Sequence, residues 1–169
     1  MASAIHAVTR RATLTILLAW LLAGTLDITT AILYYTGASA AGAERLLQGI
    51  ASGVLGAAAF TGGTATAVLG LVLHYLIALI WTLVLFVALT VVTALRRHLV
   101  LTGVAYGVIV WLAMNLIVLP LSNVRRAPIR LGPAIVAAVI LVFCIGLPIS
   151  LVVGRPMRDS CDGSRSSAD

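Results

Sequence analysis

Three polar residues, Asp27, His74 and Asn115, stand in otherwise apolar stretches of this sequence. An aspartate beside an imidazole can relay a proton or hold a cation, because burial and pairing move the pKa of both groups. Ionisable groups inside a membrane cost a few kcal/mol, so they normally face protein or a cavity instead of lipid. The same residues would also suit a hydrogen-bonded pair that only fixes how helices pack. The sequence leaves both interpretations open.

Each of the three residues belongs to a stripe of mostly small side chains that recurs every fourth position. The stripes are Ala19, Ala23, Asp27 and Ala31; Thr66, Gly70, His74 and Ala78; and Gly103, Gly107, Trp111 and Asn115. Residues at this spacing share one helix face, and small ones let helices approach closely. Asp27 and His74 lie at matching depths, roughly nine and ten residues from one membrane surface at about 1.5 Å per residue. We therefore predict a polar cluster in the outer half of a helix bundle, with an Asp27–His74 contact at its centre.

A fourth polar residue, Gln48, precedes the second stripe in a short Gly-rich segment. Its side chain could reach the same cavity, or it could cap loop backbone. We predict a polar intramembrane site of Asp27, His74, Asn115 and Gln48.

No residue pattern predicts catalysis, a cofactor or a metal. The sequence has no HExxH motif, no paired carboxylates and no Ser/His/Asp spacing of a hydrolase. A metal site would want three or four ligands, and the stripes supply two. Cys144 lies in an apolar run and Cys161 in a polar tail, and no CxxC motif is present. We expect a protein that is not an enzyme.

The composition predicts a multi-pass membrane protein with one domain. The chain has 169 residues, of which 62% are apolar and only 9% charged, and its mean hydropathy is +1.15. Soluble domains carry about 25% charged residues. The net charge of +6 comes from arginines at the ends of apolar runs, where topology signals lie. This placement argues against nucleic acid as the partner.

The apolar runs predict an all-α, integral membrane four-helix bundle with an additional short half-helix. We expect a polar lead at 1–11, a transmembrane domain at 12–153 and a disordered tail at 154–169. The four helices span about 12–36, 64–95, 100–119 and 133–153, and Pro148 should kink the last one. The half-helix, 44–60, is too short to span and ends at a Gly-Gly break. It is either re-entrant or interfacial.

The distribution of arginines favours four spans with both termini in the cytoplasm. That topology places one group of arginines inside: Arg10, Arg11, Arg96, Arg97, Arg155, Arg158 and Arg165. It leaves outside Arg45, Arg125, Arg126 and Arg130. A spanning half-helix would remove this bias. Arginine without lysine, together with abundant Ala, Gly and Val, suggests a bacterial inner membrane.

Several short segments together resemble a family of small, uncharacterised bacterial multi-pass inner-membrane proteins. These segments are 47–53, 60–63, 70–74, 106–108, 114–115 and 120–122. The resemblance covers most of residues 20–153. A more distant one is to the YagU-type inner-membrane proteins, which implies four helices and a histidine on the second. Neither family implies an activity.

Two functions fit these observations. In the first, a small membrane module handles a proton, cation or small polar solute through the polar cluster. Four helices are few for a transporter, so we expect this module to be a homo-oligomer. In the second, the chain is a structural or accessory subunit of a larger membrane complex, and the cluster is a helix-packing device. The partners are thus the lipid bilayer and either further copies or another membrane protein.

Overall fold

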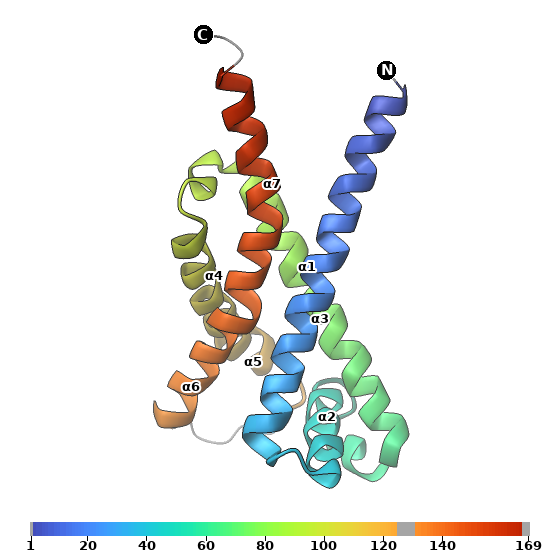
Figure 1. The fold of residues 1–169 in the computed structure, drawn as a ribbon. Helices are drawn as coiled ribbons and strands as arrows, with labels where there is room; N and C mark the ends of the chain where they lie inside the picture. Colours follow the sequence, from blue (N-terminus) through green and yellow to red (C-terminus); the bar gives the residue numbers. More distant parts are fainter. Residues whose placement is uncertain (1, 125–130, 167–169) are drawn as a thin grey trace.

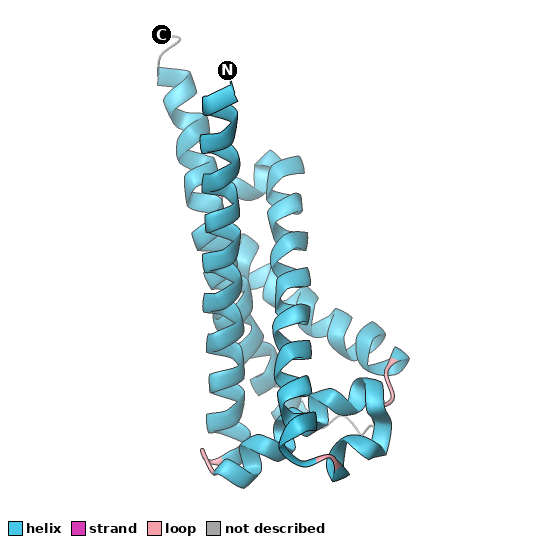
Figure 2. Ribbon diagram, turned by 90° about the vertical axis from the view of Figure 1, so that its right-hand side faces the viewer, coloured by secondary structure: helices cyan, strands magenta, loops and turns pink. Residues whose placement is uncertain are grey.

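The computed structural model describes residues 2–124 and 131–166, and this part of the chain is helical without any strand (Figures 1 and 2). The α-helices are α1 (Ala2–Thr36), α2 (Ala40–Leu55), α3 (Gly63–Val91), α4 (Leu99–Ala113), α5 (Leu119–Leu121), α6 (Leu131–Leu141) and α7 (Leu147–Ser166). Two 3₁₀ turns, η1 (Gly56–Thr61) and η2 (Thr93–Arg96), follow α2 and α3. Two π-helical turns, η3 (Met114–Val118) and η4 (Val142–Gly146), interrupt the last two long helices.

Four helical stretches are long and apolar enough to cross a membrane. They are Arg10–Thr36, Gly63–Val91, Leu99–Leu121 and Leu131–Met157. They pack as a bundle in which the two chain ends lie at one end, here called the terminal end (Figure 1). Large apolar side chains such as Leu18, Val72 and Leu101 point outward and are more than half exposed. The prediction of an all-helical bundle with four helices long and apolar enough to cross a membrane is confirmed.

Helix α2 lies across the opposite end of the bundle, which we call the α2 end (Figure 1). The chain turns into α2 at Gly37 and Ala38, both with positive φ, and the Ser39 side chain accepts a hydrogen bond from the amide of Gly42. Helix α2 packs closely on α3, because a Cβ atom at Gly70 would overlap the carbonyl oxygen of Leu47. The small-residue stripe of α3 is therefore a packing face.

Helix α4 crosses the last long helix with the two backbones in contact. A Cβ atom on Gly103 would lie 2.9 Å from the carbonyl oxygen of Gly146, and one on Gly107 would lie 2.5 Å from the Cα atom of Val142. Both distances are too short for a side chain. The GxxxG spacing of Gly103 and Gly107 thus marks a true helix–helix crossing.

Each π-helical turn ends two residues before a proline. Turn η3 ends at Val118, before Pro120, and turn η4 ends at Gly146, before Pro148. A proline inside a helix has no N–H to donate, and its ring pushes against the carbonyl four residues earlier. Widening the preceding turn relieves this conflict. The distortion predicted at Pro148 is thus present as a π-helical turn, and a second one precedes Pro120.

The ends of the helices differ from the predicted boundaries. Helix α1 begins at Ala2, within the predicted polar lead, and α7 continues to Ser166, through the segment 154–169 predicted to be disordered. The α2 helix begins earlier and ends earlier than the predicted half-helix 44–60, since η1 forms its last part. Extending an existing helix avoids the cost of nucleation, so polar residues can continue one that apolar residues started. Buried Val153 and Gly154 pack the start of this continuation against the bundle.

The contact between α2 and α3 can be tested at Gly70. We expect Gly70→Ala to lower the free energy of unfolding by about 1–3 kcal/mol, because the new methyl group meets backbone that has little room to move. The matched control is Gly49→Ala on α2, where nothing lies within 4 Å of the added atom. The control should be neutral or stabilising, by up to about 1 kcal/mol. The stability of both variants is measured by denaturation with SDS in mixed micelles, followed by tryptophan fluorescence. Equal stabilities of Gly70→Ala and Gly49→Ala would contradict the close contact between α2 and α3.

Candidate functional site

Two of the predicted site residues, Asp27 and His74, line an open cavity at the α2 end. This outer cavity has a volume of about 650 Å³ and lies between α1, α2 and α3. Its lining residues are Asp27, Ile28, Ala31, Tyr35, Thr36, Gly42, Arg45, Leu46, Ile50 and His74. Its surface is mostly apolar, and Asp27, Arg45 and His74 place three ionisable side chains in it.

A smaller inner cavity of about 110 Å³ lies deeper in the bundle. It is lined by Asp27, Ile50, His74, Ile77, Ala78, Trp81, Val110, Met114, Leu141 and Ile145. Asp27, His74 and Ile50 therefore border both cavities. The other residues that line the inner cavity are apolar or aromatic. The carboxylate of Asp27 and the imidazole of His74 therefore lie at the boundary between the two cavities.

The His74 ring joins α3 to α1. Its Nε2 atom lies 2.9 Å from the carbonyl oxygen of Gly24. A carbonyl oxygen can only accept, so in this bond Nε2 carries the proton and donates it. In the neutral ring the other nitrogen, Nδ1, then has a free lone pair. The bond to Gly24 therefore leaves Nδ1 as the acceptor nitrogen of the neutral ring.

Asp27 lies near His74 without bonding to it directly. The two groups are close enough to interact electrostatically, yet no hydrogen bond or ion pair joins them in the described part of the chain. Asp27 also interacts electrostatically with Tyr35 and with Cys144, whose sulfur lies 3.4 Å from the Thr30 hydroxyl. We predicted an Asp27–His74 contact; the two side chains line the same cavities, and the imidazole bonds to the Gly24 carbonyl of α1 and not to the carboxylate.

Gln48 and Asn115 do not join this pair. The buried Gln48 side chain donates to the carbonyl of Gly63, at 3.2 Å, and to the Glu44 carboxylate, at 3.3 Å. It thus ties α2 to the first residue of α3. The Asn115 amide donates to the carbonyl of Trp111, at 2.9 Å, one turn back in its own helix. Neither side chain lines the outer or the inner cavity.

Sequence reasoning missed several residues of the cavities. Arg45 lines the outer cavity from α2, with its guanidinium 5.0 Å from the centre of the Phe60 ring. Met114 and Ile145 line the inner cavity from the two π-helical turns. The two prolines that follow these turns were the available signal, since π-helical turns often occur at functional sites.

The inner cavity is closed toward the terminal end. The Tyr106 hydroxyl donates to the carbonyl of Trp81, and the two rings meet edge to face with their centroids 6.3 Å apart. Beyond this pair the core holds large, fully buried apolar side chains, among them Leu85, Leu89 and Ile149. The two cavities therefore lie next to each other, with Asp27, Ile50 and His74 in the lining of both, on the α2 side of this apolar core.

Among the described residues, no group of three or more His, Cys, Asp or Glu side chains could hold a metal ion. Comparisons with protein-family models, curated proteins and solved structures gave no match.

Cysteine accessibility can test whether water enters the outer cavity. In a background with Cys144→Ala and Cys161→Ser, we expect Ala31→Cys to react with a membrane-impermeant methanethiosulfonate added at the α2 end, because Ala31 lines that cavity. The control is Leu33→Cys, at nearly the same depth of α1, where Leu33 is 58% exposed on the outer face of the bundle. A lipid-facing thiol ionises poorly and should react at least about tenfold more slowly. Equal rates would show that no water-filled cavity exists there.

Proposed function

We propose that this chain is a bacterial inner-membrane protein that takes up a proton or small cation at Asp27 and His74. The observation that supports this proposal is that these two side chains border both cavities. A carboxylate with no hydrogen bond to described residues keeps its oxygens available for a proton or cation. The free Nδ1 lone pair of His74 supplies a second acceptor nearby. Cation and proton sites inside membrane bundles use ionisable groups of this kind.

In the proposed orientation both termini lie in the cytoplasm and the α2 end faces outward. The arginine distribution supports this orientation. Helix α2, with 16 residues including Glu44 and Arg45, then lies at the outer interface and covers part of the bundle. The proton or cation enters beside Tyr35 and Thr36 and reaches Asp27 through the outer cavity.

Release on the cytoplasmic side requires the closed core to open or a second copy to complete the path. Leu85, Leu89 and Ile149 are fully buried and block the direct route. Four membrane-spanning helices are few for a transport pathway. We therefore propose that the working unit is a homo-oligomer.

The second candidate function is a structural subunit of a larger membrane complex. It is favoured by the polar bonds that tie α1 to α3. Trp20 donates through Nε1 to the carbonyl of Tyr75, at 2.7 Å, and the hydroxyls of Thr25 and Tyr75 lie 2.9 Å apart. With the His74–Gly24 bond these contacts form a helix-joining set, in which His74 would have a packing role alone.

Asp27→Asn tests the first function directly. The amide cannot hold a negative charge, so we expect proton or cation flux into proteoliposomes to fall by at least about tenfold. Glu44→Gln is the matched control, since it removes a carboxylate near the same end without altering the lining of either cavity. A pH-sensitive dye trapped in the vesicles reports the proton flux. Normal flux in Asp27→Asn, at equal protein content, would refute the site.

Mass spectrometry of the assembly, purified from native membranes in mild detergent, separates the two functions. We expect a homo-oligomer if the protein carries out uptake itself. A foreign subunit present in fixed stoichiometry would instead favour the structural function. Under that function, Asp27→Asn should lower the amount of assembled complex and leave no flux to measure.

A further inference from the structure

The terminal end has a cavity of its own, far from Asp27 and His74. It has a volume of about 610 Å³ and lies where the start of α4 meets α7. Its lining residues are Arg97, His98, Leu99, Val100, Leu101, Val104, Leu151 and Arg155. One part of this terminal cavity is basic and the other is wholly apolar.

The two arginines of the terminal cavity differ from their neighbour Arg96. Arg96 donates to the carbonyls of Leu89, at 2.6 Å, and Thr90, at 3.0 Å, and so closes the end of α3. Arg97 and Arg155 are exposed, and neither forms an ion pair or hydrogen bond with any side chain that the structure describes. Their positive charges are therefore available to a ligand.

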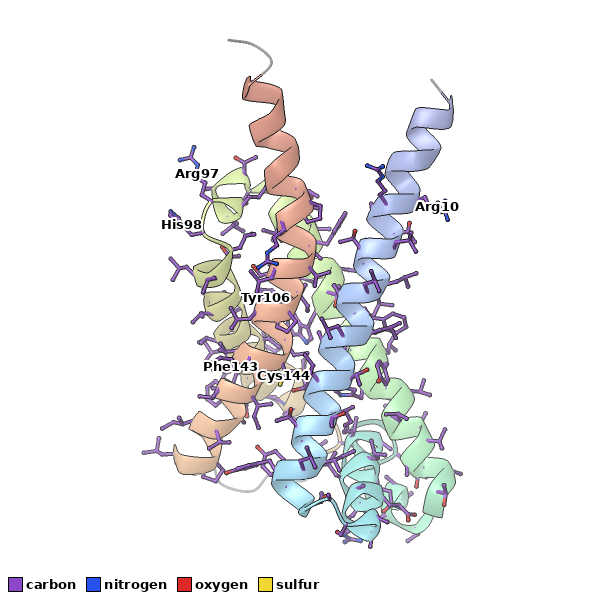
Figure 3. All side chains as sticks on the ribbon, viewed as in Figure 1. Arg10, Arg97, His98, Tyr106, Phe143 and Cys144 are labelled. Atoms are coloured by element: carbon purple, nitrogen blue, oxygen red, sulfur yellow. The ribbon has the colours of Figure 1, made fainter. Side chains whose placement is uncertain are left out.

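The apolar part of the terminal cavity lies along the first turns of α4. Val100, Leu101 and Val104 are 60%, 67% and 38% exposed, so a ligand can cover them. The basic residues sit at the end of this apolar stretch; in a bilayer crossed by α4 and α7 they would lie at the level of the lipid phosphates. Figure 3 shows Arg97 and His98 at this end of the molecule.

We propose that the terminal cavity binds an anionic phospholipid. Arg97 and Arg155 hold its phosphate, because a guanidinium pairs with phosphate oxygens through two parallel hydrogen bonds. His98 adds a donor, and an acyl chain lies on Val100, Leu101 and Val104. Basic pockets at the cytoplasmic ends of transmembrane helices bind anionic lipid headgroups by this combination. The inference goes beyond proton or cation uptake and does not depend on Asp27.

A matched pair of double variants can test the site. Arg97→Gln with Arg155→Gln removes two charges from the terminal cavity. Arg10→Gln with Arg11→Gln removes two charges from α1, which does not line this cavity. Both variants have the same net charge, so a difference between them reports the cavity and not general attraction.

The measurement is native mass spectrometry of the purified full chain titrated with phosphatidylglycerol. We expect the wild type to retain the lipid and the cavity variant to bind it about 30-fold more weakly, from about one kcal/mol for each arginine. The α1 variant should bind within about threefold of the wild type. Phosphatidylcholine, the neutral comparison, should bind weakly to all three.

Two further arms define the ligand. Val104→Phe should fill the apolar floor and weaken binding, whereas Ile109→Phe, on the same helix outside the cavity, should not. Displacement of the lipid by millimolar inorganic phosphate would show a phosphate site without lipid specificity and overturn the proposal. Equal weakening in both arginine variants, or no retention by the wild type, would overturn it as well. Helical circular dichroism and a single gel-filtration peak confirm that each variant is folded.

Discussion

This apolar bundle is held together by hydrogen bonds that side chains of one helix donate to backbone carbonyls of another. Trp20 and His74 join α1 and α3 in this way, Tyr106 joins α4 to α3, and Ser150 donates to the carbonyl of Leu99, at 2.6 Å. The hydrophobic effect gives lipid-embedded helices little reason to associate, so close packing and such hydrogen bonds decide their arrangement. Helix carbonyls can accept a second hydrogen bond, which makes them partners at any position along the helix. The site at Asp27 and His74 depends on this arrangement, because it fixes the imidazole and leaves the carboxylate unbonded.

Glycines supply the close approach that these hydrogen bonds require. Gly70 admits the backbone of α2, and Gly103, Gly107 and Gly146 admit the crossing of α4 with the last long helix. Gly24, whose carbonyl receives the His74 ring, also leaves room for the Tyr75 ring, 3.0 Å from where its Cβ would lie. Small residues and polar residues on the same stripe therefore act together. The small residues let two helices approach closely, and the polar side chains can then form hydrogen bonds between them.

The sequence was sufficient for the four long helices and for the packing faces that carry Gly70, Gly103 and Gly107. Hydropathy over long runs identifies spans, and i, i+4 spacing identifies faces, because both depend on local geometry. The partner of each polar side chain was not predictable, since it depends on which carbonyl lies within about 3 Å once the helices are packed. Hence Asn115 bonds within its own helix and Gln48 bonds to the first residue of α3. The π-helical turns were not predictable either, because they depend on how the packed helices accommodate Pro120 and Pro148. The shape of the inner cavity depends on the same turns, since Met114 and Ile145 line it.

The four stretches that could span a membrane are unequal in length. A bilayer around them would have to accommodate helices of different hydrophobic length. At about 1.5 Å per residue, the stretch Arg10–Thr36 with 27 residues reaches about 40 Å, whereas Leu99–Leu121 with 23 residues reaches about 35 Å. A hydrocarbon core is about 30 Å thick, and mismatch is relieved by tilt or by local changes in membrane thickness. A bilayer around these helices would accommodate the difference by tilt of the longer helix or by being thinner beside α4 than beside α1. Where the bilayer is thinner on one side of the bundle, other membrane proteins with short spans would associate preferentially on that side. Helix length alone would set this preference.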